Sequence, residues 1–147
     1  MSNVNTITTK VAHTSATTEK IVLSYTAASN HAANVFFDCM VRGSAGGTQS
    51  EFFVYCCDSF TGGTSSPITQ TKVRQTDPET AQGSWLSWDA SSQPTPSGSV
   101  LVDQITLGTQ QAGPTRVRDV RGGKSIYITT KNATVSTPVD ITGNCNQ

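Results

Sequence analysis

Apolar and polar residues alternate with a period of two in several short runs along the chain, and no window of a dozen residues has the spacing of an amphipathic helix. The runs are rich in β-branched and aromatic residues, and clusters of Gly, Pro, Asn and Ser separate them. About eight short strands with closely spaced turns are typical of two packed antiparallel sheets. The pattern therefore predicts an all-β protein, a single antiparallel β-sandwich with jelly-roll-like connectivity.

The most informative stretch is a candidate β-hairpin between residues 34–42 and residues 51–57, with Val41 opposite Phe52. One face of this hairpin is apolar and is expected to meet the core. The other face mixes charged residues with large apolar ones. Such a face carries more apolar surface than solvent usually covers, so we expect a second layer over it, from this chain or from a neighbour. The inward residues are Val35, Phe37, Cys39, Val41, Phe52, Val54 and Cys56, and the large outward residues are Phe36, Met40, Phe53 and Tyr55.

A second hairpin is predicted around Gly122 and Gly123, between residues 116–121 and 124–129. A two-residue Gly-Gly connection indicates a type I′ turn, because both central residues of that turn need positive φ. The hairpin would carry the main basic cluster of the sequence, and its tip would place Arg121 opposite Lys124. Like charges in that position are unfavourable unless negative charge lies nearby. Two interpretations stay open: contact with an acidic partner surface, or a solvated tip relieved by Asp119. The cluster comprises Arg116, Arg118, Arg121 and Lys124.

Two shorter runs also predict strands. Residues 20–25 predict a strand with Ile21, Leu23 and Tyr25 facing inward, and residues 67–74 predict an edge strand.

Trp85 and Trp88 are three residues apart, which on a strand places them on opposite faces. One Trp in the core and one at an interface is the simpler interpretation. An exposed platform for sugar stacking is the alternative.

Residues 1–18 are rich in hydroxyl side chains, and Val4, Ile7 and Val11 are their aliphatic residues. A segment this polar does not bury enough surface to fold alone, so it is either a flexible leader or an arm ordered by another chain. We predict an extended N-terminal arm over residues 1–18 and a β-sandwich domain over residues 19–147. The first residues lack the regions of a secretory signal, so we expect assembly in a host cytoplasm.

The chain of 147 residues has ten Lys plus Arg and ten Asp plus Glu, so its formal net charge is zero and only 14% of its residues are charged. An average soluble domain has roughly 25%. Neutrality and low charge weaken the repulsion that keeps a free monomer in solution. They also argue against nucleic acid as a partner. No run reaches the roughly 18 apolar residues of a transmembrane helix, so no membrane partner is expected either.

We expect no catalytic, metal or cofactor site. His13 lies in the arm and His31 in a predicted turn, so neither suits a Ser-His-Asp arrangement, and the carboxylates are scattered singly. The cysteines do not have the paired spacing of a zinc site, and reduced structural thiols are favoured over a disulfide. These are Cys39, Cys56, Cys57 and Cys145.

The polar arm, the Thr/Ser-rich sandwich and the low charge together resemble the virion structural proteins of tailed bacteriophages, most of all capsid decoration, or cement, proteins. The resemblance is one of overall character along the whole chain. It implies a non-enzymatic protein of the virion that stabilises a capsid lattice by binding the major capsid protein or another virion protein. It also implies a homo-oligomer, with a trimer favoured by analogy, whose residues 4–11 add to a neighbour's sheet edge.

The alternatives are a carbohydrate- or receptor-binding module of a tail fibre, and a tail component. The residues expected at a protein interface are Val4, Ile7, Val11, Phe36, Met40, Phe53, Tyr55, Arg116, Arg118 and Arg121.

Overall fold

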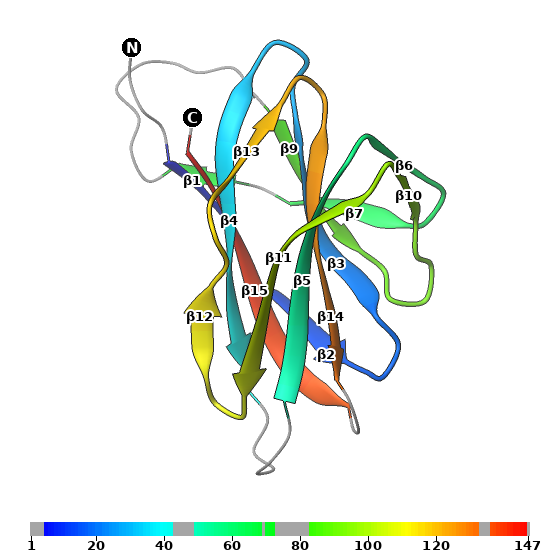
Figure 1. Ribbon diagram of the computed structural model, residues 1–147, viewed down its shortest axis with the longest axis vertical. Helices are drawn as coiled ribbons and strands as arrows, with labels where there is room; N and C mark the ends of the chain where they lie inside the picture. The colour runs from blue at the N-terminus through cyan, green and yellow to red at the C-terminus, as the bar shows by residue number, and fades with distance from the viewer. Residues whose placement is uncertain (1–4, 43–48, 69, 73–82, 133–135, 147) are drawn as a thin grey trace.

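The computed structural model describes residues 5–42, 49–68, 70–72, 83–132 and 136–146, and every regular element within these ranges is a strand (Figure 1). The strands are β1 (Asn5–Thr8), β2 (Val11–Ser15), β3 (Lys20–Ala27), β4 (Ala32–Val41), β5 (Gln49–Cys57), β6 (Ser59–Thr61), β7 (Ser65–Ile68), β8 (Gln70–Lys72), β9 (Gly83–Trp88), β10 (Thr95–Ser97), β11 (Val100–Gly108), β12 (Ala112–Pro114), β13 (Arg118–Arg121), β14 (Ser125–Asn132) and β15 (Thr137–Asn146).

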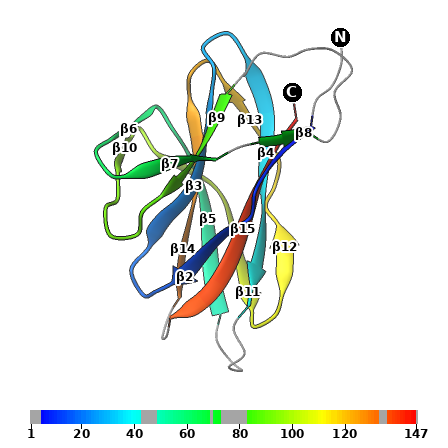
Figure 2. The same ribbon diagram turned by 180° about the vertical axis from the view of Figure 1, so that it is seen from behind.

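These strands form two sheets that pack face to face, together with a small ribbon (Figures 1 and 2). The seven-stranded sheet has the order β12-β4-β15-β1-β8, with β13 also pairing with β4 and β2 with β15. The six-stranded sheet has the order β11-β5-β14-β3-β9-β7, and β6 pairs with β10 in the ribbon. The prediction of an all-β antiparallel sandwich is confirmed. Successive long strands β3, β4 and β5 alternate between the two sheets, as strands do in jelly-roll sandwiches.

The predicted hairpin of residues 34–42 and 51–57 is wrong in its pairing and right in its faces. β4 lies in the seven-stranded sheet and β5 in the six-stranded sheet, so the two strands face each other across the core. The side chains of Phe37, Val41, Phe52 and Val54 are fully buried, as predicted. Alternation fixes which side of a strand is apolar. It does not distinguish a hydrogen-bonded neighbour from a facing sheet, because both arrangements bring the apolar sides together.

The second predicted hairpin is also wrong in its strand pairing, although the predicted turn is present. Gly122 and Gly123 have φ of 55° and 79°, and Lys124 N donates to Arg121 O over 3.0 Å. Beyond the turn, β13 pairs with β4 and β14 pairs with β3 and β5. The Gly-Gly turn therefore carries the chain from one sheet to the other.

The strands flanking the core follow the sequence prediction in part. Leu23 and Tyr25 are buried in the core, but a bulge in the β3–β14 pairing adds Val22 to the core and moves Ile21 to the outer side, beside Trp88 and Tyr127. The single edge strand predicted over residues 67–74 is instead two short strands in different sheets, β7 and β8, and each is the last strand in its sheet order. Residues 73–74 lie outside the described part.

The N-terminal segment differs from the predicted arm. β1 and β2 pair with β15 of the same chain, so residues 5–15 belong to the seven-stranded sheet. The segment has few apolar side chains. Backbone hydrogen bonds to β15 and buried hydroxyl groups hold it in the sheet instead. Gly143 N donates to Thr8 Oγ1 (2.9 Å), and Thr130 Oγ1 donates to Ser15 Oγ (3.2 Å). The low apolar content indicated that the segment needs a partner, and β15 is that partner here.

Threonine side chains bridge two gaps in the seven-stranded sheet, at the opposed residues Phe37 and Gly143. Neither β12 nor β13 reaches Phe37, so Phe37 N donates instead to Thr115 Oγ1 (2.9 Å), and Thr115 N donates to Phe37 O (2.8 Å). Thr8 fills the equivalent gap beside Gly143.

We expect Thr115→Val to lower the free energy of unfolding by about 1–3 kcal/mol, because valine keeps the volume but leaves the buried N–H of Phe37 without an acceptor. Thr115→Ser, which keeps the hydroxyl, is the control and should lower the free energy of unfolding by less than Thr115→Val does. Urea denaturation of the three proteins measures the difference. A Val variant as stable as the Ser variant would show that the bridge contributes nothing.

Candidate protein interface

Within the described part of the chain, the side chains that could bind a metal ion do not gather. No group of three or more His, Cys, Asp or Glu side chains among these residues could hold a metal ion. All four cysteines are free, in agreement with the prediction of reduced thiols, and burial raises the pKa of the Cys39 thiol. No helix in the described ranges has the length and apolar character to cross a membrane. The outer faces of the two sheets carry five of the predicted interface residues.

The outer face of the seven-stranded sheet gathers three of the predicted interface residues. Asn144 on β15 lies directly opposite Phe36 on β4 and Ile7 on β1, so all three side chains share this face. Asn144 Nδ2 donates to Asp38 Oδ2 over 2.9 Å, and Met40 follows on the same side of β4. No described strand covers this face (Figure 2). We call the surface formed by Ile7, Phe36, Asp38, Met40 and Asn144 the β4 face.

The outer face of the six-stranded sheet is covered over one half by the chain itself. Phe60 on β6 packs on Trp88 and Tyr127, with ring centroids 5.1 and 5.5 Å apart. Trp88 Nε1 donates to Ser24 Oγ (2.9 Å). The β6–β10 ribbon thus covers Trp88 and Tyr127, which are not the large apolar residues over which the sequence predicted a second layer.

The tryptophans lie on opposite faces of β9, as predicted. Trp85 is in the core and Trp88 beneath the ribbon, and the exposed fractions of Trp85, Trp88 and Tyr127 are 1%, 9% and 3%. None of these three rings offers a platform on which a sugar could stack.

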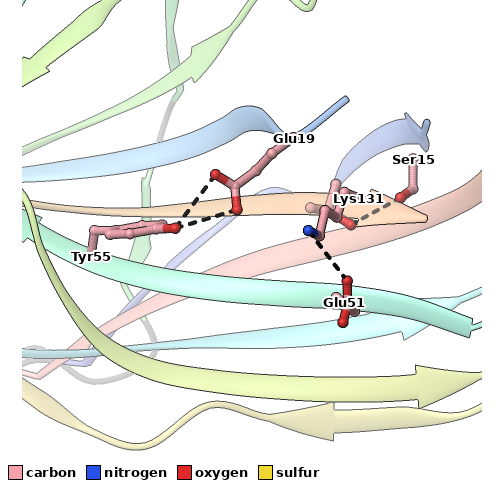
Figure 3. Close-up of polar contacts among 6 residues, drawn as sticks. Ser15, Glu19, Glu51, Tyr55 and Lys131 are labelled. Carbon is pink, nitrogen blue, oxygen red and sulfur yellow. Dashed lines mark hydrogen bonds and ion pairs between the residues drawn. The ribbon is translucent and has the colours of Figure 1, made fainter. Parts of the chain in front are cut away.

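The uncovered half of this outer face carries the other two predicted aromatic residues. Tyr55 stacks on Tyr127 at a centroid distance of 5.0 Å and lies opposite Leu101 of β11. Its hydroxyl donates to the Glu19 carboxylate over 3.3 and 3.4 Å (Figure 3). We call the surface formed by Glu51, Phe53, Tyr55, Leu101 and Lys131 the β5 face.

Lys131 contacts two other residues of the β5 face. Lys131 Nζ lies 3.8 Å from Glu51 Oε2 (Figure 3). It also lies 5.4 Å from the ring centroid of Phe53. The Phe53 and Tyr55 rings are therefore half-buried by contacts within the chain, and Leu101 is the exposed large apolar side chain of this face.

The tyrosines of this region are not acid–base groups at neutral pH. Burial and the neighbouring Glu19 carboxylate raise the pKa of Tyr55 to about 12. Burial also raises the pKa of Tyr127, against a hydrogen bond with Ser99 that lowers it. Tyr55 therefore keeps its proton and remains a hydrogen-bond donor.

The flank of the sandwich carries exposed apolar residues that the sequence analysis missed. The exposed fractions of Val100, Leu101 and Val117 are 62%, 49% and 55%. The run of residues 100–102 was the available signal, because three successive apolar side chains of a strand cannot all face the core.

The predicted basic cluster is divided by the fold. Arg121 Nε lies 2.6 Å from Asp119 Oδ2, and Lys124 Nζ lies 2.7 Å from Asp58 Oδ1, so these cations have local carboxylates. Arg118 is half-buried and donates to the backbone oxygen of Val102. Arg116 is exposed and belongs to no ion pair in the described part of the chain.

The predicted interface residues thus fall into separate places. Ile7, Phe36 and Met40 come together on the β4 face, and Phe53 and Tyr55 lie on the opposite side of the sandwich. Val11 is partly buried against the core. Val4 lies outside the described residues.

Comparisons with known proteins place the chain in no family. No protein-family model matches the sequence, and no curated protein matches it significantly. One solved structure with some similarity is the crystal structure of infectious bursal disease virus VP2 subviral particle, at a TM-score of 0.25 and 13% identity. The match covers 97% of this chain and 40% of that chain, so this chain spans well under half of its length. A TM-score this low supports neither a shared fold nor a shared function.

Proposed function

We propose that the protein is a non-enzymatic structural protein of a virion, and that it acts by binding protein neighbours through the outer faces of its sandwich. The observation that carries this proposal is that large apolar side chains stand on both outer faces, Phe36 and Met40 on one and Phe53, Tyr55 and Leu101 on the other. Met40 and Leu101 are exposed, and the three aromatic residues beside them are half-buried. Apolar side chains that gather at the surface are typical of protein interaction sites.

Two opposite contact faces suit a protein that bridges subunits. A module that recognises one partner needs one such surface, whereas a component of a lattice contacts neighbours on more than one side. The neutral, charge-poor composition supports the same role, because it weakens the repulsion between protein surfaces. The finer proposal is a capsid decoration protein that stabilises the lattice by binding the major capsid protein, and it rests on the resemblance in sequence character.

The alternative of a carbohydrate-binding module gains no support from the aromatic residues that suggested it. Trp85, Trp88 and Tyr127 are buried. A glycan array probed with the purified chain is the direct test of this alternative, and binding that is lost on Tyr55→Ala would favour it over the capsid decoration role.

Localisation and rebinding on particles test the proposal. Electron microscopy of virions labelled with an antibody against the chain should show label on the head. In co-sedimentation with particles lacking the protein, Met40→Asp on the β4 face and Leu101→Asp on the β5 face should each weaken binding by about tenfold or more, because a charge is buried without a partner.

The matched control for these variants is Thr95→Asp, which places the same charge on the exposed surface of the ribbon and should bind as the wild type does. Virions without label, or face variants that bind as well as the control, would contradict the proposal.

A further inference from the structure

The outermost strand of the six-stranded sheet is β11, and its nine residues make it the longest edge strand of the described part. An exposed edge strand presents unpaired N–H and C=O groups, which are a template for strand addition and aggregation. The other strands at the ends of the sheet orders are short: β7 has four residues and contains Pro67, β8 has three, and β12 has three and contains Pro114. The β11 edge is therefore the one at which a neighbour's strand could add over a long stretch.

Groups of β11 itself and of the segments that follow it bind outward backbone groups at two places along this edge. Arg118 Nη2 donates to Val102 O, and Gln104 N donates to Asp103 Oδ1 (2.9 Å). At the far end, Gly108 N donates to Gln111 Oε1 (2.7 Å), and Gly108 O accepts from Gln111 N (3.1 Å). Since outward-pointing groups recur every second residue of a strand, the remaining outward groups are Gln104 O and both backbone groups of Thr106.

Asp103 has two roles in this arrangement. Its Oδ1 accepts from Gln104 N on the edge, and its Oδ2 accepts from Arg116 N over 2.6 Å. The carboxylate thus ties the segment that follows β12 against the edge, and a bulge in the β11–β5 pairing between Leu101 and Asp103 disturbs the edge at the same level. Bulges, charged groups and covering segments are the devices by which sheet edges are protected.

We propose that Asp103, Gln111 and Arg118 close the β11 edge to strand addition, and so determine that the protein meets its neighbours by its outer faces and not by sheet extension. A second copy of the chain is the partner that the closed edge excludes. The closing of the edge is argued independently of the proposed function, and only the consequence that neighbours meet the outer faces rests on it.

Asp103→Ala is the decisive variant, because it frees the N–H of both Gln104 and Arg116. We expect this variant to self-associate at a protein concentration about tenfold or more below that of the wild type in sedimentation velocity. Amide hydrogen exchange should show new protection at Thr106 in the associated form. Asp119→Ala is the matched control, because it removes an exposed carboxylate that pairs with Arg121 and not with a backbone group of β11.

A second substitution separates edge pairing from misfolding. Thr106→Pro removes an N–H that points away from β5, and proline on an edge blocks strand addition. We expect Thr106→Pro to reverse the self-association of Asp103→Ala and to leave the wild-type state unchanged. The proposal would be overturned if folded Asp103→Ala sediments as the wild type does, or if its association persists with Thr106→Pro. The proposed function is unaffected by either result, since the particle-binding variants test it separately.

Discussion

Replacing Trp85 with alanine is expected to lower the free energy of unfolding by about 3–5 kcal/mol, the range typical of truncating a large buried aromatic residue. Trp85 is the largest fully buried side chain of the protein's described part. It extends from β9 of one sheet to the other sheet, where its ring meets Phe37 edge-on at a centroid distance of 6.0 Å, and it also packs against Tyr25 at 4.9 Å. The loss of this ring leaves a cavity between the sheets. The neighbouring strands cannot move in to fill it without breaking backbone hydrogen bonds within their sheets.

Trp85→Phe is the matched control. Phenylalanine keeps much of the ring contact and removes an Nε1–H that is buried without a hydrogen-bond acceptor among the described residues. We expect Trp85→Phe to lower the free energy of unfolding by clearly less than Trp85→Ala does. Urea denaturation followed by circular dichroism measures both variants, and the fluorescence of Trp88 gives a second probe. An alanine variant within about 1 kcal/mol of the wild type would contradict the central packing role of Trp85.

Gly143→Ala is expected to lower the free energy of unfolding by about 1–3 kcal/mol, because a side chain there overpacks the core. Gly143 lies on β15 under the Trp85 ring, and an added Cβ would overlap ring atoms Cζ3, Cη2 and Cε3. The ring packs against both Tyr25 and Phe37 and is fully buried, so a shift away from the new Cβ would disturb these contacts.

A glycine of the same sheet provides the control for this prediction. A Cβ on Gly113 would meet only Leu107 Cδ2, at 3.6 Å, which is ordinary van der Waals contact, so Gly113→Ala should have little effect. In a Trp85→Leu background, the cost of Gly143→Ala should also fall, because the clashing ring is gone. Equal costs in both backgrounds would contradict a direct clash, since residues in contact are not additive.

Much of the core could be predicted from the sequence. The period-two pattern predicted strands throughout and identified the inward side of β4 and β5, because each strand has two faces and only one of them can be apolar without cost. The opposite placement of Trp85 and Trp88 follows from the same rule. The tight turn at Gly122 and Gly123 follows from the φ requirement of its two residues.

The pairing of the strands could not be predicted in the same way. Both predicted hairpins turned out to be crossings between the sheets, because an apolar face is equally satisfied by an adjacent strand and by a facing one. The same ambiguity affected the candidate interface. Phe36 and Phe53, expected on one surface, lie on opposite sides of the sandwich once β4 and β5 belong to different sheets. Residues 5–15 likewise gave no sign that β15 would be their partner.

The sequence by itself therefore determined the class of fold, the inward face of its longest strands and a surface low in charge. Only the tertiary structure decided which outward apolar residues gather on one face, where Trp85 meets Gly143, and which side chains close the β11 edge. The physical reason is the distance along the chain between the residues that determine each feature. Side-chain alternation and turn conformation are set by a few neighbouring residues, whereas strand order and the bond between Asp103 and the backbone of Arg116 depend on contacts between segments distant along the chain.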